Sequence, residues 1–328
     1  MGRLLNRLGA NLLAVHTRRA SSVKLFDRKM KREQRDWAAA SADYEHCQYV
    51  KDEIAYRVAD KVFDLTKFHE ICLDLGCGGG YIAPNLIKEN VGALIQCDLS
   101  EGLVRRSHSA GDPEIPTLRV VADEELVPFR ESSFDLILSS LSAHWINDLP
   151  GWFKRCFNVL RPDGAMIGAM LAGDTLFELR CSLQLAEMER LGGMGAHISP
   201  FVKPQDIGSL MNRAGFDMVT LDTDEMEVGY PSMFALLYDL QCMGESNATS
   251  RRPVHLRKDI LIAADSIYRT MYGTDGKYPA SFELISFIGW RPGPLMPKPA
   301  KRGSQNVSLK DLGKIIENPP VMEEETKK

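Results

Sequence analysis

Residues 71 to 81 combine an apolar run, an acid and three glycines, and they constrain the fold more than any other segment. The order Ile-Cys-Leu-Asp-Leu-Gly-Cys-Gly-Gly-Gly-Tyr predicts a buried strand that carries Asp74 and runs into a glycine turn. Gly76, Gly78 and Gly80 permit backbone conformations that a Cβ would forbid, so the chain can approach a ligand closely. A helix that follows such a turn begins with unpaired N–H groups. The segment therefore predicts a site for a nucleotide-type ligand.

The glycine spacing distinguishes this site from a dinucleotide fingerprint. Such a fingerprint would place its third glycine at position 81, where this chain has Tyr81. Asp74 lies within the predicted strand, two residues before the first glycine. A carboxylate there suits a ligand with a cationic near end, such as an amino acid ammonium, better than a pyrophosphate.

Residues 72 to 80 resemble the first motif of class I S-adenosylmethionine-dependent methyltransferases. Segments that resemble later landmarks of this family follow in its order, at residues 93–98, 120–129, 133–142 and 160–164. The resemblance implies an α/β fold with a Rossmann-like seven-stranded sheet, mostly parallel with one antiparallel strand, and with helical lid insertions. It also implies S-adenosyl-L-methionine as the cofactor.

The same resemblance gives each acid an expected contact. Asp98, at the end of the second strand, would accept both ribose hydroxyls, and Asp123 would meet the adenine amino group. Leu99 and Glu124 would form walls around adenine. The alternative for each acid is a helix cap or a turn residue. The expected cofactor-binding residues are Asp74, Gly76, Gly78, Gly80, Asp98, Leu99, Asp123 and Glu124.

Composition indicates a globular protein and argues against nucleic-acid binding and a membrane-spanning segment. The 328 residues are 44% hydrophobic and 26% charged, with a net charge of −4, so nothing suggests a nucleic-acid partner. No apolar run is long enough to span a bilayer. Seven cysteines without a C-x-x-C pair predict buried thiols in a reducing compartment. None of the seven histidines has an acid two residues later and there is no H-E-x-x-H, so we predict no bound metal.

The first 26 residues contain five basic residues and no acid before Asp27. An Arg-rich, acid-free amphipathic start is typical of a mitochondrial transit peptide, expected here over residues 1–20. The alternative is an ordinary amphipathic helix. Further along we expect an N-terminal helical segment at 24–65, a methyltransferase-like domain at 66–290 and a mostly disordered tail at 291–328.

Apolar runs near residues 71, 93, 118, 134 and 165 predict parallel strands that alternate with helices. Residues 214–222 are expected to form a further strand, and residues 278–290 the last, antiparallel one. The ligand crevice should lie at the carboxyl ends of the parallel strands. Two additions, at about 173–200 and 230–275, should roof this crevice as lids.

The substrate pocket is less constrained, because methyl transfer needs mainly orientation, which supplies roughly 7–11 kcal/mol. The catalytic residues therefore remain unknown. Several alternatives stay open: the histidines could be satisfied core residues, and Glu178 could be the capping-box partner of Asp174 or Thr175. The substrate-pocket candidates are His144, Trp145, Glu178, Arg180 and His197.

Several segments resemble the mitochondrial complex I assembly factor 5 family over about residues 24–315; they are residues 26–28, 141–150, 173–176, 178–180 and 239–247. The resemblance implies an arginine hydroxylase that modifies an iron–sulfur subunit of complex I early in assembly, at the matrix face of the inner membrane. It implies peripheral membrane association and leaves room for a small assembly partner. Two alternatives remain, namely a methyltransferase of the malonyl-carrier-protein type, which residues 175–180 also resemble, and a non-enzymatic assembly chaperone.

Overall fold

The computed structural model describes residues 24–253 and 255–296. The predicted transit peptide, residues 1–20, lies outside the described residues, and so does the predicted tail from residue 297 onward. A separate unit begins at Leu295. The helices and strands of the described residues all precede that point.

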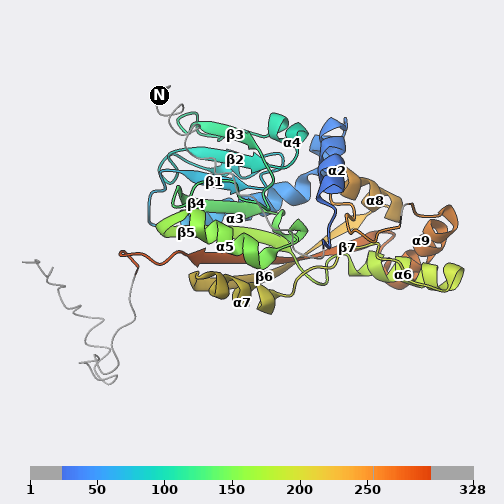
Figure 1. The fold of residues 1–328 in the computed structure, drawn as a ribbon. Coiled ribbons are helices and arrows are strands. Elements are labelled where there is room, and N and C mark those ends of the chain that lie inside the picture. Colours follow the sequence, from blue (N-terminus) through green and yellow to red (C-terminus); the bar gives the residue numbers. More distant parts are fainter. Residues whose placement is uncertain (1–23, 254, 297–328) are drawn as a thin grey trace, which may run out of the picture. The chain divides into compact units, whose positions relative to one another are not determined.

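Seven strands of the described chain form one sheet in the order β3-β2-β1-β4-β5-β7-β6 (Figure 1). Strands β1 to β5 pair in parallel, and β7 runs antiparallel to both β5 and β6. The predicted sheet, mostly parallel with one antiparallel strand, is confirmed. The strands are β1 (Cys72–Leu75), β2 (Leu94–Asp98), β3 (Thr117–Val121), β4 (Phe134–Ser140), β5 (Leu160–Leu171), β6 (Asp217–Tyr230) and β7 (Tyr278–Trp290).

The chain reverses its strand order between β1 and β4, at the centre of the sheet. In open α/β sheets the ligand crevice lies at such a switch point, outside the carboxyl ends of the strands. One detail differs from the expectation. Residues 160–164 resemble a turn before strand five, but they form the start of β5, with Asp163 at φ +62°.

Alternate strand side chains enter two separate apolar clusters, because successive residues of a strand point to opposite faces. One face packs against α5 (Leu149–Val159) and α7 (Pro204–Ala214). The opposite cluster contains residues of α3 (Tyr49–Phe63), α6 (Phe177–Leu191), α8 (Met233–Cys242) and α9 (Lys258–Tyr272). The N-terminal helical segment expected at 24–65 is divided, since a 3₁₀ turn (Tyr44–Cys47) precedes α3. The short helix α4 (Glu101–Arg106) follows β2.

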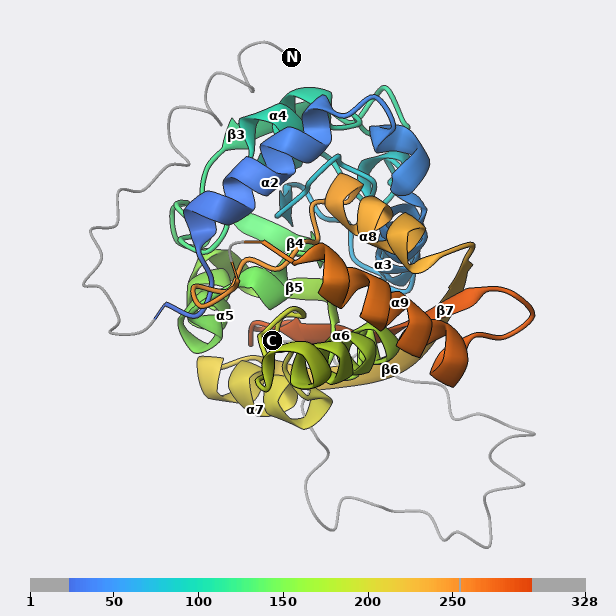
Figure 2. The same ribbon diagram turned by 90° about the vertical axis from the view of Figure 1, so that its right-hand side faces the viewer.

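Helix α2 (Arg28–Ala40) begins at Asp27, whose side chain accepts the Met30 N–H. It lies on the same side of the molecule as α8 and α9 (Figure 2). Arg28, Lys31 and Arg35 are spaced three and four residues apart and so share one helix face. Lys31 and Arg35 are buried. A helix normally buries an apolar stripe, so this one needs anionic partners beneath it.

Candidate cofactor cradle and substrate pocket

The glycine loop after β1 is fixed to β2 by its backbone. The N–H groups of Gly76 and Cys77 both donate to the Cys97 carbonyl, at 2.7 and 3.0 Å. Gly78 has φ +54°, which favours glycine, and a Cβ built there would meet no atom within 4 Å. Its N–H donates to Asp98 Oδ2 at 3.0 Å. The loop therefore presents bare backbone to open space beside an acid.

Asp74 is fully buried, and neither of its carboxylate oxygens has a hydrogen-bond partner among the described residues. Burial and the nearby charge of Asp98 raise the pKa of Asp74 to about 8. An unsatisfied buried polar group costs about 1–3 kcal/mol. A cationic ligand that hydrogen-bonds to Asp74 would remove this cost. The structure therefore agrees with the cationic ligand end that the sequence predicts.

Asp98 and Glu124 converge on one guanidinium. Nη1 of Arg35 lies 3.1 Å from both oxygens of Asp98 and 2.8 Å from Glu124 Oε1. Arg35 also donates to Ser142 Oγ at 3.3 Å. Burial opposes the charge on Arg35, but the two carboxylates hold its pKa above the ordinary value.

A second arginine of α2 completes this charge cluster. Arg28 Nη2 lies 2.8 Å from Asp123 and 2.8 Å from Glu124. Burial opposes ionisation of Glu124, but with two guanidinium partners its pKa is lowered to about 2. Burial raises the pKa of Asp98, although Arg35 acts in the opposite direction. The expected adenine and ribose acids are thus gathered in one place, and α2 neutralises them.

These residues form what we call the cofactor cradle: the loop 76–80 with Asp74, Asp98, Asp123 and Glu124. The space left between its glycine loop, Asp98 and Arg35 is about 20 Å³, enough for about one water molecule. The open Gly78 and the unpaired Asp74 fit an amino acid end of a cofactor. Asp98 fits a ribose only after Arg35 leaves. The donor set therefore fits S-adenosylmethionine once α2 has moved its arginine.

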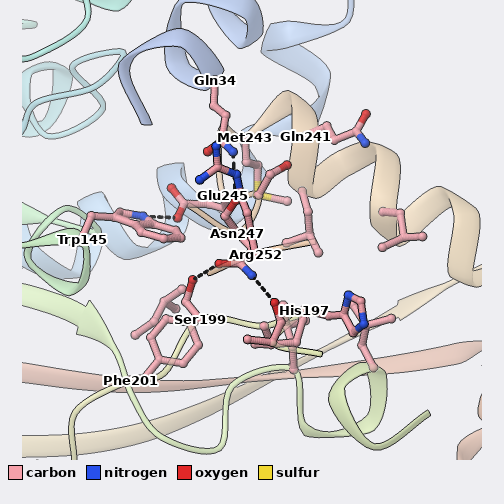
Figure 3. Close-up of a pocket in the computed structure, with 18 of the residues that line it drawn as sticks. Gln34, Trp145, His197, Ser199, Phe201, Gln241, Met243, Glu245, Asn247 and Arg252 are labelled. Atoms are coloured by element: carbon pink, nitrogen blue, oxygen red, sulfur yellow. Dashed lines mark hydrogen bonds between the residues drawn. The ribbon is translucent and has the colours of Figure 1, made fainter. Parts of the chain in front are cut away.

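A larger cavity of about 670 Å³ lies next to the cradle. Figure 3 shows residues that line it. Lys51 and Leu141 line both spaces, so they form a shared wall. Residues from both expected lid segments line it, including Leu179 and Leu240. We call it the large pocket. Its size and its largely apolar lining, in which leucine is the most frequent residue, are typical of a ligand site.

Glu245 is the central polar residue of the large pocket (Figure 3). Its Oε2 accepts hydrogen bonds from Trp145 Nε1 at 2.8 Å and His144 Nε2 at 3.1 Å. Its Oε1 lies 3.0 Å from Lys51 Nζ. Burial opposes ionisation, but Lys51 and His144 hold the pKa of Glu245 well below its usual range. Burial lowers the pKa of His144, so the neutral ring donates from Nε2.

The structure separates the other substrate candidates. His197 lines the large pocket and lies 2.7 Å from Glu187 Oε1. Arg180 donates to backbone carbonyls of Gly173 and Thr175. Glu178 is not brought into this pocket, because Ser281 of β7 donates to its carboxylate through both N–H and Oγ.

The expected helix cap at the start of α6 is wrong. Leu176 occupies the N-cap position in a left-handed conformation and makes no side-chain cap. Thr175 Oγ1 instead bonds to the backbone of Glu283 in β7. Glu178 therefore ties α6 to the sheet and is neither a capping-box partner nor part of the large pocket.

Sequence reasoning missed the cations of α2, as well as Lys51 and Glu245. The sequence does contain a pattern that indicates the role of α2, because the basic residues at 28, 31 and 35 share one helix face. Glu245 lies within a segment that carried the family resemblance, but no local pattern marked it. Lys31 is also informative: it is buried, lies 3.3 Å from the Trp145 ring centre, and donates to the Gly244 and Ser246 carbonyls.

Three further expectations concern metals, membranes and thiols. Among the described residues no group of three or more His, Cys, Asp or Glu could hold a metal ion, and the prediction of no metal stays a prediction. No helix in the described ranges is both long and apolar enough to cross a bilayer. All seven cysteines are free, and six of them are buried. The expected buried thiols are thus confirmed for six of the seven.

Comparisons with known proteins agree with this geometry. A family model, "Methyltransferase domain", matches residues 73–168. A solved methyltransferase-fold structure from Bacillus halodurans has a TM-score of 0.51 at 16% identity, covering 71% of this chain and 98% of that one. A malonyl-[acyl-carrier protein] O-methyltransferase of Methylovorus sp. is 28% identical, over 80% of this chain and 88% of that protein.

A second relative is much more similar. "Arginine-hydroxylase NDUFAF5, mitochondrial" of Danio rerio is 50% identical to this chain over 294 residues. The match covers 89% of the chain and 91% of that protein. Identity at this level and coverage shows that the chain belongs to the NDUFAF5 arginine-hydroxylase family.

Proposed function

We propose that this chain is a mitochondrial protein-arginine hydroxylase and an assembly factor for respiratory complex I. Its substrate is an arginine of an iron–sulfur subunit, modified at an early assembly stage. It acts at the matrix face of the inner membrane through peripheral association, together with a small assembly partner. Family membership supports the activity, because the relative from Danio rerio carries the name of a mitochondrial arginine hydroxylase.

One structural observation carries the proposal: a large pocket with a buried carboxylate shares a wall with the cofactor cradle. Lys51 and Leu141 separate the two spaces. A group held in the large pocket therefore lies beside the place where a cofactor's reactive end would be. Such an arrangement of adjoining cofactor and substrate sites is what a modifying enzyme requires.

The residues of the cradle define what the chain itself contributes. Asp74 would take the cofactor's ammonium and Asp98 its ribose hydroxyls, while the loop at Gly78 admits close backbone contact. S-adenosylmethionine, when bound, supplies an electrophilic methyl group on a sulfonium. Hydroxylation converts a C–H bond into C–OH; with dioxygen as oxidant, the second oxygen atom leaves as water and a reductant supplies two electrons and two protons.

Intact-mass spectrometry of the iron–sulfur subunit, co-expressed with this chain, tests the proposal. We expect a mass gain of one oxygen atom, localised by fragmentation to an arginine. Replacing that arginine by lysine in the subunit should abolish the gain. An unmodified subunit would contradict the proposal and favour the chaperone alternative.

A methyltransferase is the second candidate, because the cradle acids fit S-adenosylmethionine and a carrier-protein methyltransferase is 28% identical to the chain. This candidate predicts a gain of one CH₂ on the subunit or on malonyl-carrier protein. The same mass measurement, with malonyl-carrier protein as a parallel substrate, separates the two reactions.

A further inference from the structure

The large pocket contains one buried carboxylate oxygen with unused hydrogen-bonding capacity. The Glu245 side chain is 7% exposed, and its Oε2 already accepts two hydrogen bonds. Its Oε1 accepts none among the described residues, although Lys51 Nζ lies 3.0 Å away as an ion-pair partner. Lys51 therefore balances the charge of this oxygen, while the oxygen keeps a lone pair that can accept a further hydrogen bond. A planar guanidinium would supply the donor of that bond.

The orientation of Glu245 is fixed by rigid neighbours rather than by solvent. The indole of Trp145 and the neutral ring of His144 both donate to the same oxygen. Trp145 is in turn packed against Phe26 and lies under Lys31. A carboxylate held in this way is preorganised to receive a cation at its other oxygen.

The walls of the large pocket suit the apolar stem of an arginine side chain. Leucines from several elements form the walls: Leu141, Leu171, Leu176, Leu179, Leu183, Leu237 and Leu240. Among the polar lining residues, Asn247 Oδ1 accepts a hydrogen bond from Ser199 Oγ at 3.4 Å, and Asn247 Nδ2 donates to the Ala196 carbonyl (Figure 3). A cavity of about 670 Å³ holds more than one side chain, so it can also take the neighbours of an inserted residue.

Lys51 is the cation that pairs with Glu245 in the structure. Its Nζ pairs with Glu245 Oε1 and donates to the Met243 carbonyl. It also lines the cofactor cradle. Because the lysine stem is flexible, its ammonium can yield the carboxylate to an incoming cation and turn toward the cradle.

We propose that the large pocket binds an arginine-bearing protein segment, with the guanidinium on Glu245 Oε1 in exchange for Lys51 and the flanking residues against the leucine walls. This inference rests on the proposed function, since the family name supplies arginine as the target. It also deepens that function, because it places the guanidinium end beside the wall shared with the cradle.

Two substitutions of opposite expected effect test the site. Glu245→Gln keeps the shape and removes the charge, so arginine binding should weaken roughly ten- to hundredfold. Lys51→Met removes the competing cation while Glu245 stays charged, so arginine binding should strengthen several-fold. Asp135→Asn is the matched control, because Asp135 is likewise a buried, ion-paired carboxylate, but neither it nor its partner Arg161 lines the large pocket.

The probes are two acetylated tripeptide amides, leucine-arginine-leucine and leucine-citrulline-leucine, titrated by ligand-observed NMR. Citrulline has the shape of arginine without its charge. The wild type and Asp135→Asn should prefer the arginine peptide, Lys51→Met should prefer it more strongly, and Glu245→Gln should lose the preference. Equal binding of both peptides to the wild type overturns the proposal, and so does a preference retained by Glu245→Gln or weakened in Lys51→Met.

Thermal melting checks that each variant folds. If Glu245→Gln does not fold, Lys51→Met decides alone, because a purely structural ion pair predicts no gain in affinity. The test is also independent of the chemistry. If the chain binds the arginine peptide selectively but inserts no oxygen into the subunit, the guanidinium site stands and the hydroxylase function is contradicted. If Glu245→Gln still inserts oxygen into the subunit, the hydroxylase function stands and the guanidinium site at Glu245 is contradicted.

Discussion

The cofactor cradle and the large pocket adjoin each other but depend on different interactions. The cradle is closed by charge: Asp98 and Glu124 hold Arg35, and about 20 Å³ remains free. The large pocket is kept open by apolar side chains and has about 670 Å³. Access to the two sites is therefore controlled differently. The cradle has room for a ligand only after Arg35 leaves, whereas the large pocket already has room and a cationic ligand needs only to replace Lys51 at Glu245.

Helix α2 connects the two regions. Its Arg35 neutralises the cradle, while its Lys31 lies over Trp145, which orients Glu245 in the large pocket. A ligand that removes Arg35 from Asp98 therefore acts on the helix that also covers the wall of the pocket. The predictions below test whether charge really closes the cradle.

The largest effect is expected for Asp98→Ala. This change leaves the buried Arg35 with one carboxylate fewer and removes the acceptor of the Gly78 and Ser100 N–H groups. Breaking a buried ion pair costs about 3–5 kcal/mol, so the free energy of unfolding should fall by about that amount. Urea denaturation measures it. Asp123→Ala is the control, because Arg28 retains Glu124, and it should cost far less. Equal losses in the two variants would mean that the Asp98 pair does not hold the cradle closed.

Arg35→Met is expected to strengthen cofactor binding. If Arg35 competes with the ribose for Asp98, its removal should tighten S-adenosylmethionine binding roughly tenfold or more, because the open state is no longer a minor one. Isothermal titration calorimetry measures the change. Arg32→Ala, on the exposed side of the same helix, should leave affinity unchanged. Weaker binding to Arg35→Met would show that Arg35 contacts the cofactor instead of excluding it.

Cofactor affinity should depend on pH through Asp74, the buried acid of the cradle. Below pH of about 8, Asp74 is protonated in the free protein, whereas a bound ammonium favours its ionised form. Cofactor binding should therefore release a proton, and affinity should rise with pH until it levels near 8, where the ligand's own α-amino group begins to lose its charge. Calorimetry in two buffers of different ionisation enthalpy measures the proton release.

The raised pKa of Asp74 also affects the free energy of unfolding. Because the folded state holds the Asp74 proton more tightly than the unfolded state, this group makes unfolding easier as pH rises from about 4 to about 8. Asp74→Asn should remove this slope and the proton release together. Proton release that persists in Asp74→Asn would assign it to another group.

The sequence predicted the sheet well because its signals are local. Buried strands read as apolar runs, and the glycine loop with Asp74 marks its own site, so β1 to β5 and the antiparallel β7 lie close to their expected positions. The pairing of Arg35 with Asp98 joins residues 63 positions apart, and that of Trp145 with Glu245 joins residues 100 apart. No periodicity encodes such contacts, so the closure of the cradle and the polar centre of the large pocket emerged only from the fold.

Glu178 illustrates the same limit, and it gives the smallest expected effect. Its position after β5 suggested a substrate contact or a helix cap, but its carboxylate accepts hydrogen bonds from Ser281 in the neighbouring strand. Glu178→Gln keeps an acceptor and removes the charge, so the free energy of unfolding should fall by only about 1 kcal/mol. Arginine-peptide binding should remain that of the wild type, because Glu178 does not line the large pocket. A loss of peptide binding with unchanged stability would move the guanidinium site from Glu245 to Glu178 and would separate arginine recognition from the pocket beside the cradle.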